Sequence, residues 1–306
     1  MLSLHKIING VWMIEESFAA NYLPYITDFL QNPVRINPDR KAEQFLRIHN
    51  GSDSRKMIMD IDNAPEGSIA VISISGAITK HDQECGPDGM QSKASVLRAC
   101  YSTGNIKGVI LKIDSGGGEG SAMRLFIEAV SEKNKPVVAF IDDRGCSAAY
   151  GIASGCDHIV ANSNMAEIGS IGTYLTIADY EKYYEQRGIK LIDIYATAST
   201  DKNKDYYEAL KGNLAPLRKV ADKFNESFLS TIEKNREGKL TAGRDTWGTG
   251  KVWFAEDALK LGLIDEINTF SNTLNFFCMT KILKDSTYDE LKAKADRLDA
   301  IVAKLR

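Results

Sequence analysis

The sequence predicts an α/β fold built on a largely parallel sheet. Apolar, β-branched runs that are typical of buried strands recur at 68–78, 108–114, 137–141 and 159–161. Stretches of helical character separate these runs, and this alternation favours parallel strands joined by crossovers. Two of the runs end in turns of small residues. Because ligand sites in such sheets form at the carboxyl ends of strands, we expect the functional residues there.

Composition excludes several classes of function. The 306 residues are 43% hydrophobic and 26% charged, with a net charge of −3, so nothing indicates binding to nucleic acid or to an anionic membrane. The five cysteines are scattered without a CxxC pair, which predicts no disulfide framework, no metal site and no cofactor. No apolar run approaches the roughly 18 residues of a membrane span, and the chain begins without an apolar leader. We therefore expect a cytoplasmic protein.

Three parts are predicted along the chain. Residues 1–66 are expected to form an N-terminal extension, which contains a helical stretch at 19–30 and serves as an assembly arm or as a cap on the main domain. Residues 67–270 are expected to form the main domain. The tail, 271–306, carries Leu291, Leu298, Ile301 and Leu305 among charges, which predicts a short amphipathic helix for self-association.

The central motif follows the apolar run 137–141. The chain turns at Gly145 and continues as Cys146-Ser147-Ala148-Ala149, a run of small residues at the start of a predicted helix. Free backbone N–H groups point outward at a helix start, so Ser147 has the setting of a nucleophile. A simple N-cap role explains the same serine.

A second motif, Gly116-Gly117-Gly118, follows the strand that ends at Asp114. It lacks the Gly-Lys-Ser/Thr ending of a phosphate-binding loop and the later glycine of a dinucleotide site. Glycines also let backbone N–H groups approach a ligand closely, as an oxyanion hole requires. A tight turn between strand and helix is the other interpretation.

Two lysines lie in a polar loop after a predicted strand at 190–195. The loop reads Ala198-Ser-Thr-Asp-Lys-Asn-Lys204, and by composition Lys202 and Lys204 are solvated surface charges. Among the four histidines only His81 lies in a plausible catalytic loop, which keeps a Ser-His-Asp triad as an alternative.

Four segments in order resemble the serine–lysine signal peptide peptidase family (SppA-like), whose phage branch includes capsid maturation proteases. They are 113–118, 145–150, 168–173 and 250–265, the last ending in Gly-Leu-Ile-Asp. The resemblance implies a Clp protease/crotonase fold of stacked ββα units that assembles into homo-oligomers. The chain differs from the family at its lysine segment, which lacks the Gly-x-x-Lys glycine.

The resemblance also implies residue roles. Ser147 would be the nucleophile, Lys202 (or, alternatively, Lys204) its base, and Ser170 a residue that orients the lysine. The N–H groups of Gly117 or Gly118, with Ala148, would form the oxyanion hole. A lysine is neutral near pH 7 only if its pKa falls from about 10.4 by about 3, at a cost of about 4 kcal/mol, so we expect its loop to be desolvated against the nucleophile, by a neighbouring subunit or by bound peptide.

The expected function is serine endopeptidase activity on peptide or protein substrates. Phage head maturation is favoured over signal-peptide cleavage because no membrane anchor is evident. Two alternatives remain open: a catalytically inactive assembly scaffold with the same fold, and a crotonase-like enzyme acting on acyl-CoA thioesters, for which no acidic pair or basic pocket is evident.

Overall fold

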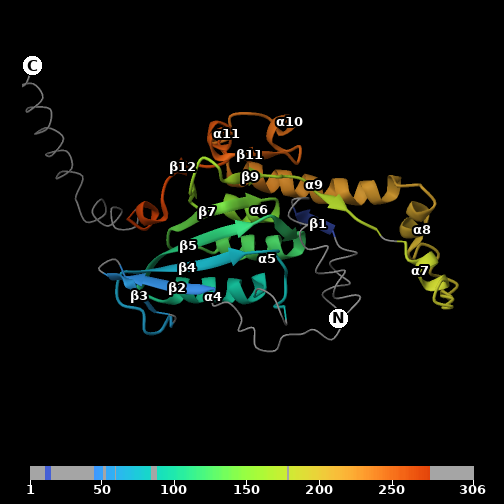
Figure 1. Cartoon of the computed structure of the whole chain (residues 1–306), viewed down its shortest axis with the longest axis horizontal. Helices are drawn as coiled ribbons and strands as arrows, with labels where there is room; N and C mark the ends of the chain where they lie inside the picture. The colour runs from blue at the N-terminus through green and yellow to red at the C-terminus, as the bar shows by residue number, and fades with distance from the viewer. Residues whose placement is uncertain are drawn as a thin grey trace, which may run out of the picture.

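The computed structural model describes residues 11–14, 45–50, 53–58, 60–83, 88–177 and 179–275. The main sheet has the order β11-β9-β7-β5-β4-β2-β3 (Figure 1). Off this path, β8 pairs with β7, and β12 pairs with β8. Its strands are β2 (Leu46–Asn50), β3 (Asp53–Ile58), β4 (Ser68–Ser75), β5 (Ile106–Ser115), β7 (Val137–Cys146), β8 (His158–Ala161), β9 (Glu167–Gly169), β11 (Val252–Phe254) and β12 (Glu266–Ile267).

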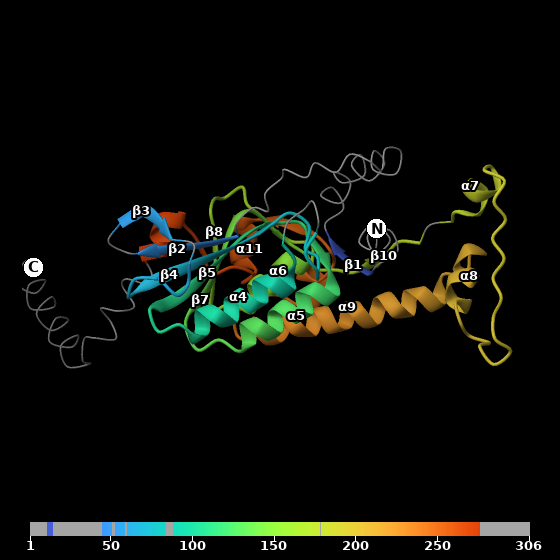
Figure 2. The ribbon, with the colours of Figure 1, turned by 90° about the horizontal axis from the view of Figure 1, so that it is seen from below.

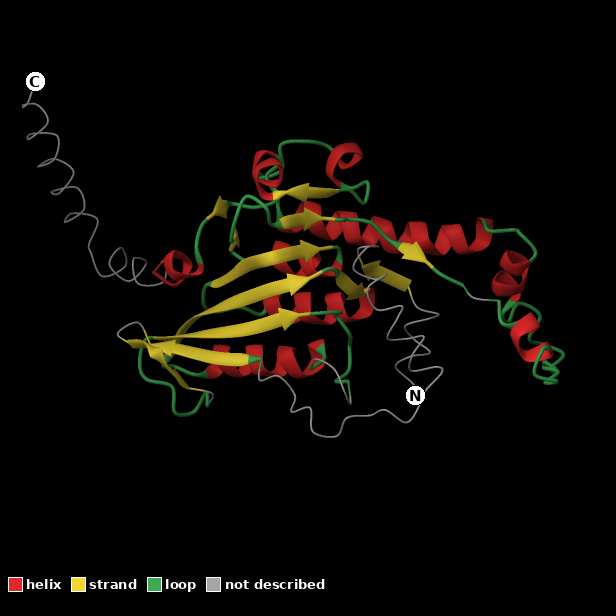
Figure 3. Cartoon of the chain, in the orientation of Figure 1, coloured by secondary structure: helices red, strands yellow, loops and turns green. Residues whose placement is uncertain are grey.

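The centre of the sheet is parallel, as the alternating pattern predicts. Ile72 of β4 pairs with Leu111 of β5, which pairs with Ala139 of β7, and all three are fully buried. The arrows of these strands point the same way in Figure 3. Continuous apolar runs fit strands covered on both faces. The predicted α/β class is therefore confirmed.

Helices cover one face of the sheet: α4 (Met90–Ser102), α5 (Gly120–Ser131), α6 (Ala148–Ser154) and the carboxyl half of α9 (Ala215–Asn235). The other face carries a smaller apolar cluster that includes Val138, Phe140 and Val160, against which Phe270 and Leu274 pack. β5, the short β6 (Gly117–Glu119) and α5 follow one another as a strand–strand–helix unit. The site elements are thus anchored in the larger of the two cores.

The sheet extends into the segment that we separated as an N-terminal extension. β2 pairs antiparallel with β4, and β3 pairs antiparallel with β2. A second, small sheet has the order β10-β1-β6 and joins β1 (Val11–Ile14) to β6 and to β10 (Tyr174–Leu175). The predicted helices at 19–30 and 287–306 lie outside the described residues.

An arm projects from the body after β10. It contains α7 (Glu181–Glu185) and α8 (Lys204–Leu210) and returns through the amino half of α9 (Figures 1 and 2). The strand predicted at 190–195 is wrong: this stretch has no neighbouring strand, and Ile192 and Ile194 are 72% and 91% exposed. Phe224 on α9, which stands at helical spacing with the buried Phe228, is also exposed. No helix within the described ranges is long and apolar enough to span a bilayer.

The carboxyl end of the main domain closes with α10 (Arg244–Trp247) and α11 (Ala255–Lys260). A glycine ends α11: Gly262 has a φ of 72°. Its N–H donates to the carbonyl of Leu259 (3.0 Å) and the N–H of Leu263 donates to that of Ala258 (2.9 Å), the pattern of a Schellman cap.

Candidate active site

Ser147 lies at the sharp turn between β7 and α6. Its φ of 54° and ψ of −122° place it in a region that residues with a side chain rarely adopt. The turn is fixed by the backbone, since the N–H of Ser147 donates to the carbonyl of Gly169 (2.7 Å) and its own carbonyl accepts from Gly151 (2.9 Å). A nucleophile on a strained strand-to-helix turn is a recurrent arrangement in hydrolases.

The hydroxyl of Ser147 is not used for capping. Ser147 stands at the N-cap position of α6 without a side-chain capping hydrogen bond. The residue is 1% exposed, and its Oγ has no hydrogen-bond partner among the described residues. A buried hydroxyl without a partner costs about 1–3 kcal/mol. The capping interpretation therefore gives no account of this side chain.

Ser170 follows the neighbouring strand end in the same way. Cys146 pairs in register with Gly169, and each is followed directly by a serine. Ser170 also has a positive φ, 48°, and its N–H donates to the carbonyl of Lys251 (2.8 Å). The structure thus brings Ser147 and Ser170 to adjacent strand ends.

The glycine turn is held against the segment after β4. The Ser115 hydroxyl donates to the carbonyl of Gly76 (2.6 Å) and accepts from the N–H of Gly117 (3.1 Å). The backbone of Ile78 holds the same turn: its N–H donates to the Gly117 carbonyl, and its carbonyl accepts from the Glu119 N–H, each at 2.9 Å. The N–H of Gly117 is held inside its own turn by the Ser115 hydroxyl, whereas Gly118 lies where β6 pairs with a separate segment, β1, so Gly118 is the better candidate of the two for an oxyanion donor. The N–H of Ala148, the first residue of α6, has no acceptor inside its helix.

Gly118 is required for this close approach. A Cβ at Gly118 would lie 2.0 Å from the Ile78 carbonyl oxygen, so Gly118→Ala is expected to shift the turn and to cost about 1–3 kcal/mol of unfolding free energy. Peptide cleavage should fall with it. Chemical denaturation measures the stability loss. Gly104→Ala is the matched control, since a Cβ at Gly104 would meet no atom within 4 Å; equal stabilities would contradict the assignment.

Within one chain the lysines do not reach Ser147. Lys202 is exposed, and Lys204, 60% exposed, pairs with Asp201 at 3.5 Å. They lie at the start of α8, which stands at the far end of α9 from α6 in both views (Figures 1 and 2). His81 is exposed and does not complete a triad either, since the Ser147 Oγ has no partner in the described part of the chain.

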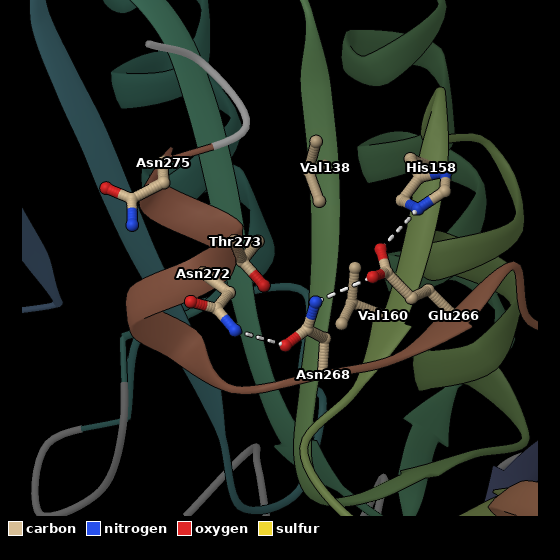
Figure 4. Close-up of a pocket in the computed structure, with 8 residues that line it drawn as sticks. All are labelled: Val138, His158, Val160, Glu266, Asn268, Asn272, Thr273 and Asn275. Carbon is tan, nitrogen blue, oxygen red and sulfur yellow. Dashed lines mark hydrogen bonds and ion pairs between the residues drawn. The ribbon is translucent and has the colours of Figure 1, made fainter. Parts of the chain in front are cut away.

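A surface hollow of about 380 Å³ lies elsewhere and is not part of this site (Figure 4). Its lining includes Val138 and His158, which stand at the amino ends of β7 and β8, whereas Ser147 follows the carboxyl end of β7. The ring of His158 contacts Glu266 at 3.3 Å, which supports a structural role for this histidine.

Residues 129–281, half of the chain, match the model of peptidase family S49. The chain belongs to this family.

Curated relatives of the S49 chain are proteases and a phage protein. Protease 4 of Haemophilus influenzae is 26% identical over 79% of this chain and 41% of its own length. A putative protease of Methanocaldococcus jannaschii is 29% identical over 56% of this chain and 55% of its own. A head-tail preconnector protein of an Enterobacteria phage is 25% identical over 68% of this chain and 42% of its own. The chain spans about half the length of these relatives.

Among solved structures, an enoyl-CoA hydratase/isomerase family member aligns with a TM-score of 0.42 and 18% identity, covering 77% of this chain and 81% of that one.

Sequence reasoning missed two parts of this S49 site. The first is β1, which pairs beside the glycine turn although it lies about a hundred residues earlier. The apolar run Val11–Ile14 was a signal for a strand, but a run of this kind does not say with which strand it pairs. The second is Ser115, whose hydroxyl fixes Gly117; a serine directly before a glycine run after a strand was the signal for it.

Proposed function

We propose that this chain is a serine endopeptidase in which Ser147 is the nucleophile and Lys202 the general base. The observation that carries the proposal is the buried, unpartnered hydroxyl of Ser147 on a strained turn, in a chain of a peptidase family. Neighbouring amides of Gly118 and Ala148 supply candidate donors for a developing oxyanion.

The reaction is acyl transfer. The Ser147 Oγ forms a bond to the carbonyl carbon of the substrate while the lysine amine takes the hydroxyl proton. The C–N bond then breaks, and the lysine returns the proton to the leaving amine. A water molecule, deprotonated by the same lysine, releases the acyl group and restores the serine.

The base is proposed to come from a second copy of the chain. A solvated lysine is charged at pH 7, and only desolvation lowers its pKa enough for base catalysis. The arm that carries Lys202 projects from the body and exposes Leu191, Ile192 and Ile194. Exposed apolar surface of this kind marks an interface, and a neighbouring copy in a closed ring would bury it. Ser170 would then orient the incoming amine.

Complementation between inactive variants tests this proposal. Ser147→Ala and Lys202→Ala should each lose peptide cleavage, by roughly 10²–10⁴-fold for the lysine variant. Coexpressed in equal amounts, the two should recover about a quarter of the wild-type rate, because one site in four pairs an intact serine with an intact lysine from its neighbour.

Lys204→Ala is the matched control and should retain activity. If instead Lys204→Ala loses peptide cleavage and Lys202→Ala keeps it, Lys204 is the base. If Ser147→Ala coexpressed with the inactive lysine variant recovers no cleavage, the base does not come from a neighbouring copy. Full activity of Ser147→Ala alone would contradict the peptidase proposal altogether. A folded wild-type assembly without any cleavage would favour the inactive scaffold.

The setting that we propose is phage head assembly, with structural proteins of the head as substrates. The preconnector relative supports it. Cleavage of coexpressed head proteins encoded beside this chain, lost with Ser147→Ala, is the result expected.

A further inference from the structure

β1 lies beside the candidate active site rather than in the main sheet. It pairs antiparallel with β6 on one edge, Met13 opposite Gly118, and with β10 on the other, Trp12 opposite Tyr174. Figures 1 and 2 both place it at the carboxyl end of the parallel strands, near α6. A segment from the start of the chain thus bridges two strands that belong to the site.

Both neighbours of β1 are continuations of site segments. β6 contains Gly117 and Gly118, and β10 begins four residues after Ser170. An extended chain held between them therefore lies between two segments of the candidate site.

The edge of β6 that faces β1 carries Gly118. Successive residues of a strand direct their N–H and C=O groups to opposite edges. The Gly117 carbonyl and the Glu119 N–H both bond Ile78, so those of Gly118 point the other way, toward Met13. β1 therefore uses the amide that we propose as an oxyanion or substrate donor.

We infer that β1 occupies the groove in which an extended peptide substrate binds, so that the chain's own residues 11–14 hold its active site closed. Peptides bind exposed strand edges by adding a strand, and their affinity comes from main-chain hydrogen bonds. The inference rests on the proposed function. It adds how the peptide substrate binds, and it adds that β1 competes with the substrate for the same groove. It agrees with the 1% exposure of Ser147, a nucleophile that must be reached by its substrate.

β1 competes strongly with a peptide substrate because a segment tethered in the same chain has an effective concentration of about a millimolar. Substrate must displace it, and weakening β1 should therefore increase reactivity. Met13→Pro removes the N–H that faces Gly118 and breaks the pairing. Met13→Val, which keeps the N–H and the strand preference, is the matched control.

Two measurements on the full chain test the inference. Labelling of Ser147 by a fluorophosphonate probe should be about tenfold faster in Met13→Pro than in the wild type, with Met13→Val unchanged. Hydrogen exchange at 117–119 should be faster in the proline variant, since its partner strand is gone. A synthetic peptide of residues 9–16 should slow the labelling of Met13→Pro, and a scrambled peptide should not.

A reversible disulfide between β1 and β10 gives a second test that does not depend on whether the proline variant folds. Trp12→Cys with Tyr174→Cys places two thiols at directly opposed antiparallel positions, within reach of a disulfide. The oxidised variant should label more slowly than the same variant after reduction, and this comparison needs no wild-type reference.

The outcomes separate the inference from the function. Equal labelling of oxidised and reduced protein, or of Met13→Pro and wild type, overturns the inference and leaves the peptidase proposal standing. Faster exchange in Met13→Pro with no labelling of Ser147 in any variant overturns the peptidase proposal, and the substrate groove with it.

Discussion

Ser147→Ala is expected to abolish peptide cleavage and at the same time to stabilise the protein. The rate should fall by at least about 10³-fold, because the covalent step loses its nucleophile. The free energy of unfolding should rise by about 1 kcal/mol, since the substitution removes a buried hydroxyl that has no partner among the described residues. Ser147→Gly should add about 1 kcal/mol more, because glycine tolerates the φ of 54°.

Opposite signs of the two effects identify a functional rather than a structural serine. Cleavage of a fluorogenic peptide and urea denaturation measure them on the same samples. Ser131→Ala, at an exposed position on α5, is the control and should change neither quantity appreciably. A loss of stability in Ser147→Ala would mean that the hydroxyl makes a contact important for folding, and the strained-nucleophile interpretation would be wrong.

Asp265→Ala is expected to destabilise the protein by about 3–5 kcal/mol, because it leaves the guanidinium of Arg236 buried without its carboxylate. Arg236 is 1% exposed and binds both oxygens of Asp265, at 2.9 and 3.0 Å. It also donates to the carbonyl of Gly262. Calorimetry or denaturant titration measures the loss.

Asp257→Ala is the matched control for this prediction. Asp257 pairs with Lys260 at 2.8 Å, but both side chains are more than half exposed. Exposed pairs contribute at most about 1 kcal/mol, so burial rather than distance should separate the two variants. Similar losses would contradict the role assigned to the buried pair.

The same carboxylate makes stability depend on acid. Burial alone would raise the pKa of Asp265, but hydrogen bonds from Arg236 and Lys239 lower it to about 2, below the ordinary value of 3.8. Its contribution is therefore complete above about pH 4 and is lost as the pH falls toward 2. Asp265→Asn should flatten this part of the stability profile, and an unchanged profile would show that another group titrates there.

This buried pair also supports the turn at Ser147. The Gly262–Asp265 segment that Arg236 binds carries the Leu263 carbonyl, which accepts the hydroxyl of Tyr150 at 2.8 Å. Tyr150 is fully buried in α6, three residues after Ser147. The Gly-Leu-Ile-Asp signature thus has a physical function, since it anchors the helix on which Ser147 stands.

Features that depend on neighbouring residues could be predicted from the sequence, and pairings between distant segments could not. The central strands were recognisable because they are apolar on both faces, and the turn at Ser147 because small residues follow a strand directly. The stretch 190–195 has the composition of a strand but finds no neighbouring strand in the part of the chain that the structure describes, and a strand needs one. The pairing of β1 with β6 joins distant segments, and no short-range pattern specifies such a register.

The lysine base could not be located for a different reason. A lysine in a polar loop looks the same whether it stays in water or is later covered, since its surroundings come from other parts of the assembly. Sequence favoured Lys202 over Lys204 by alignment of the preceding segment, and the single chain leaves both exposed. Under the proposed mechanism, the surface that packs over the arm decides which of the two acts as the base.

The packing of α9 has a mechanical consequence. A Cβ at Gly151 would meet the sulfur of Met123 at 2.3 Å and the ring of Phe228 at 3.0 Å, so α6 is clamped tightly between α5 and α9. The 21 residues of α9 form a rod about 30 Å long whose far end carries the arm. A displacement of α9 at its far end would therefore be felt in α6, the helix that follows Ser147, because no free space separates the two helices at Gly151.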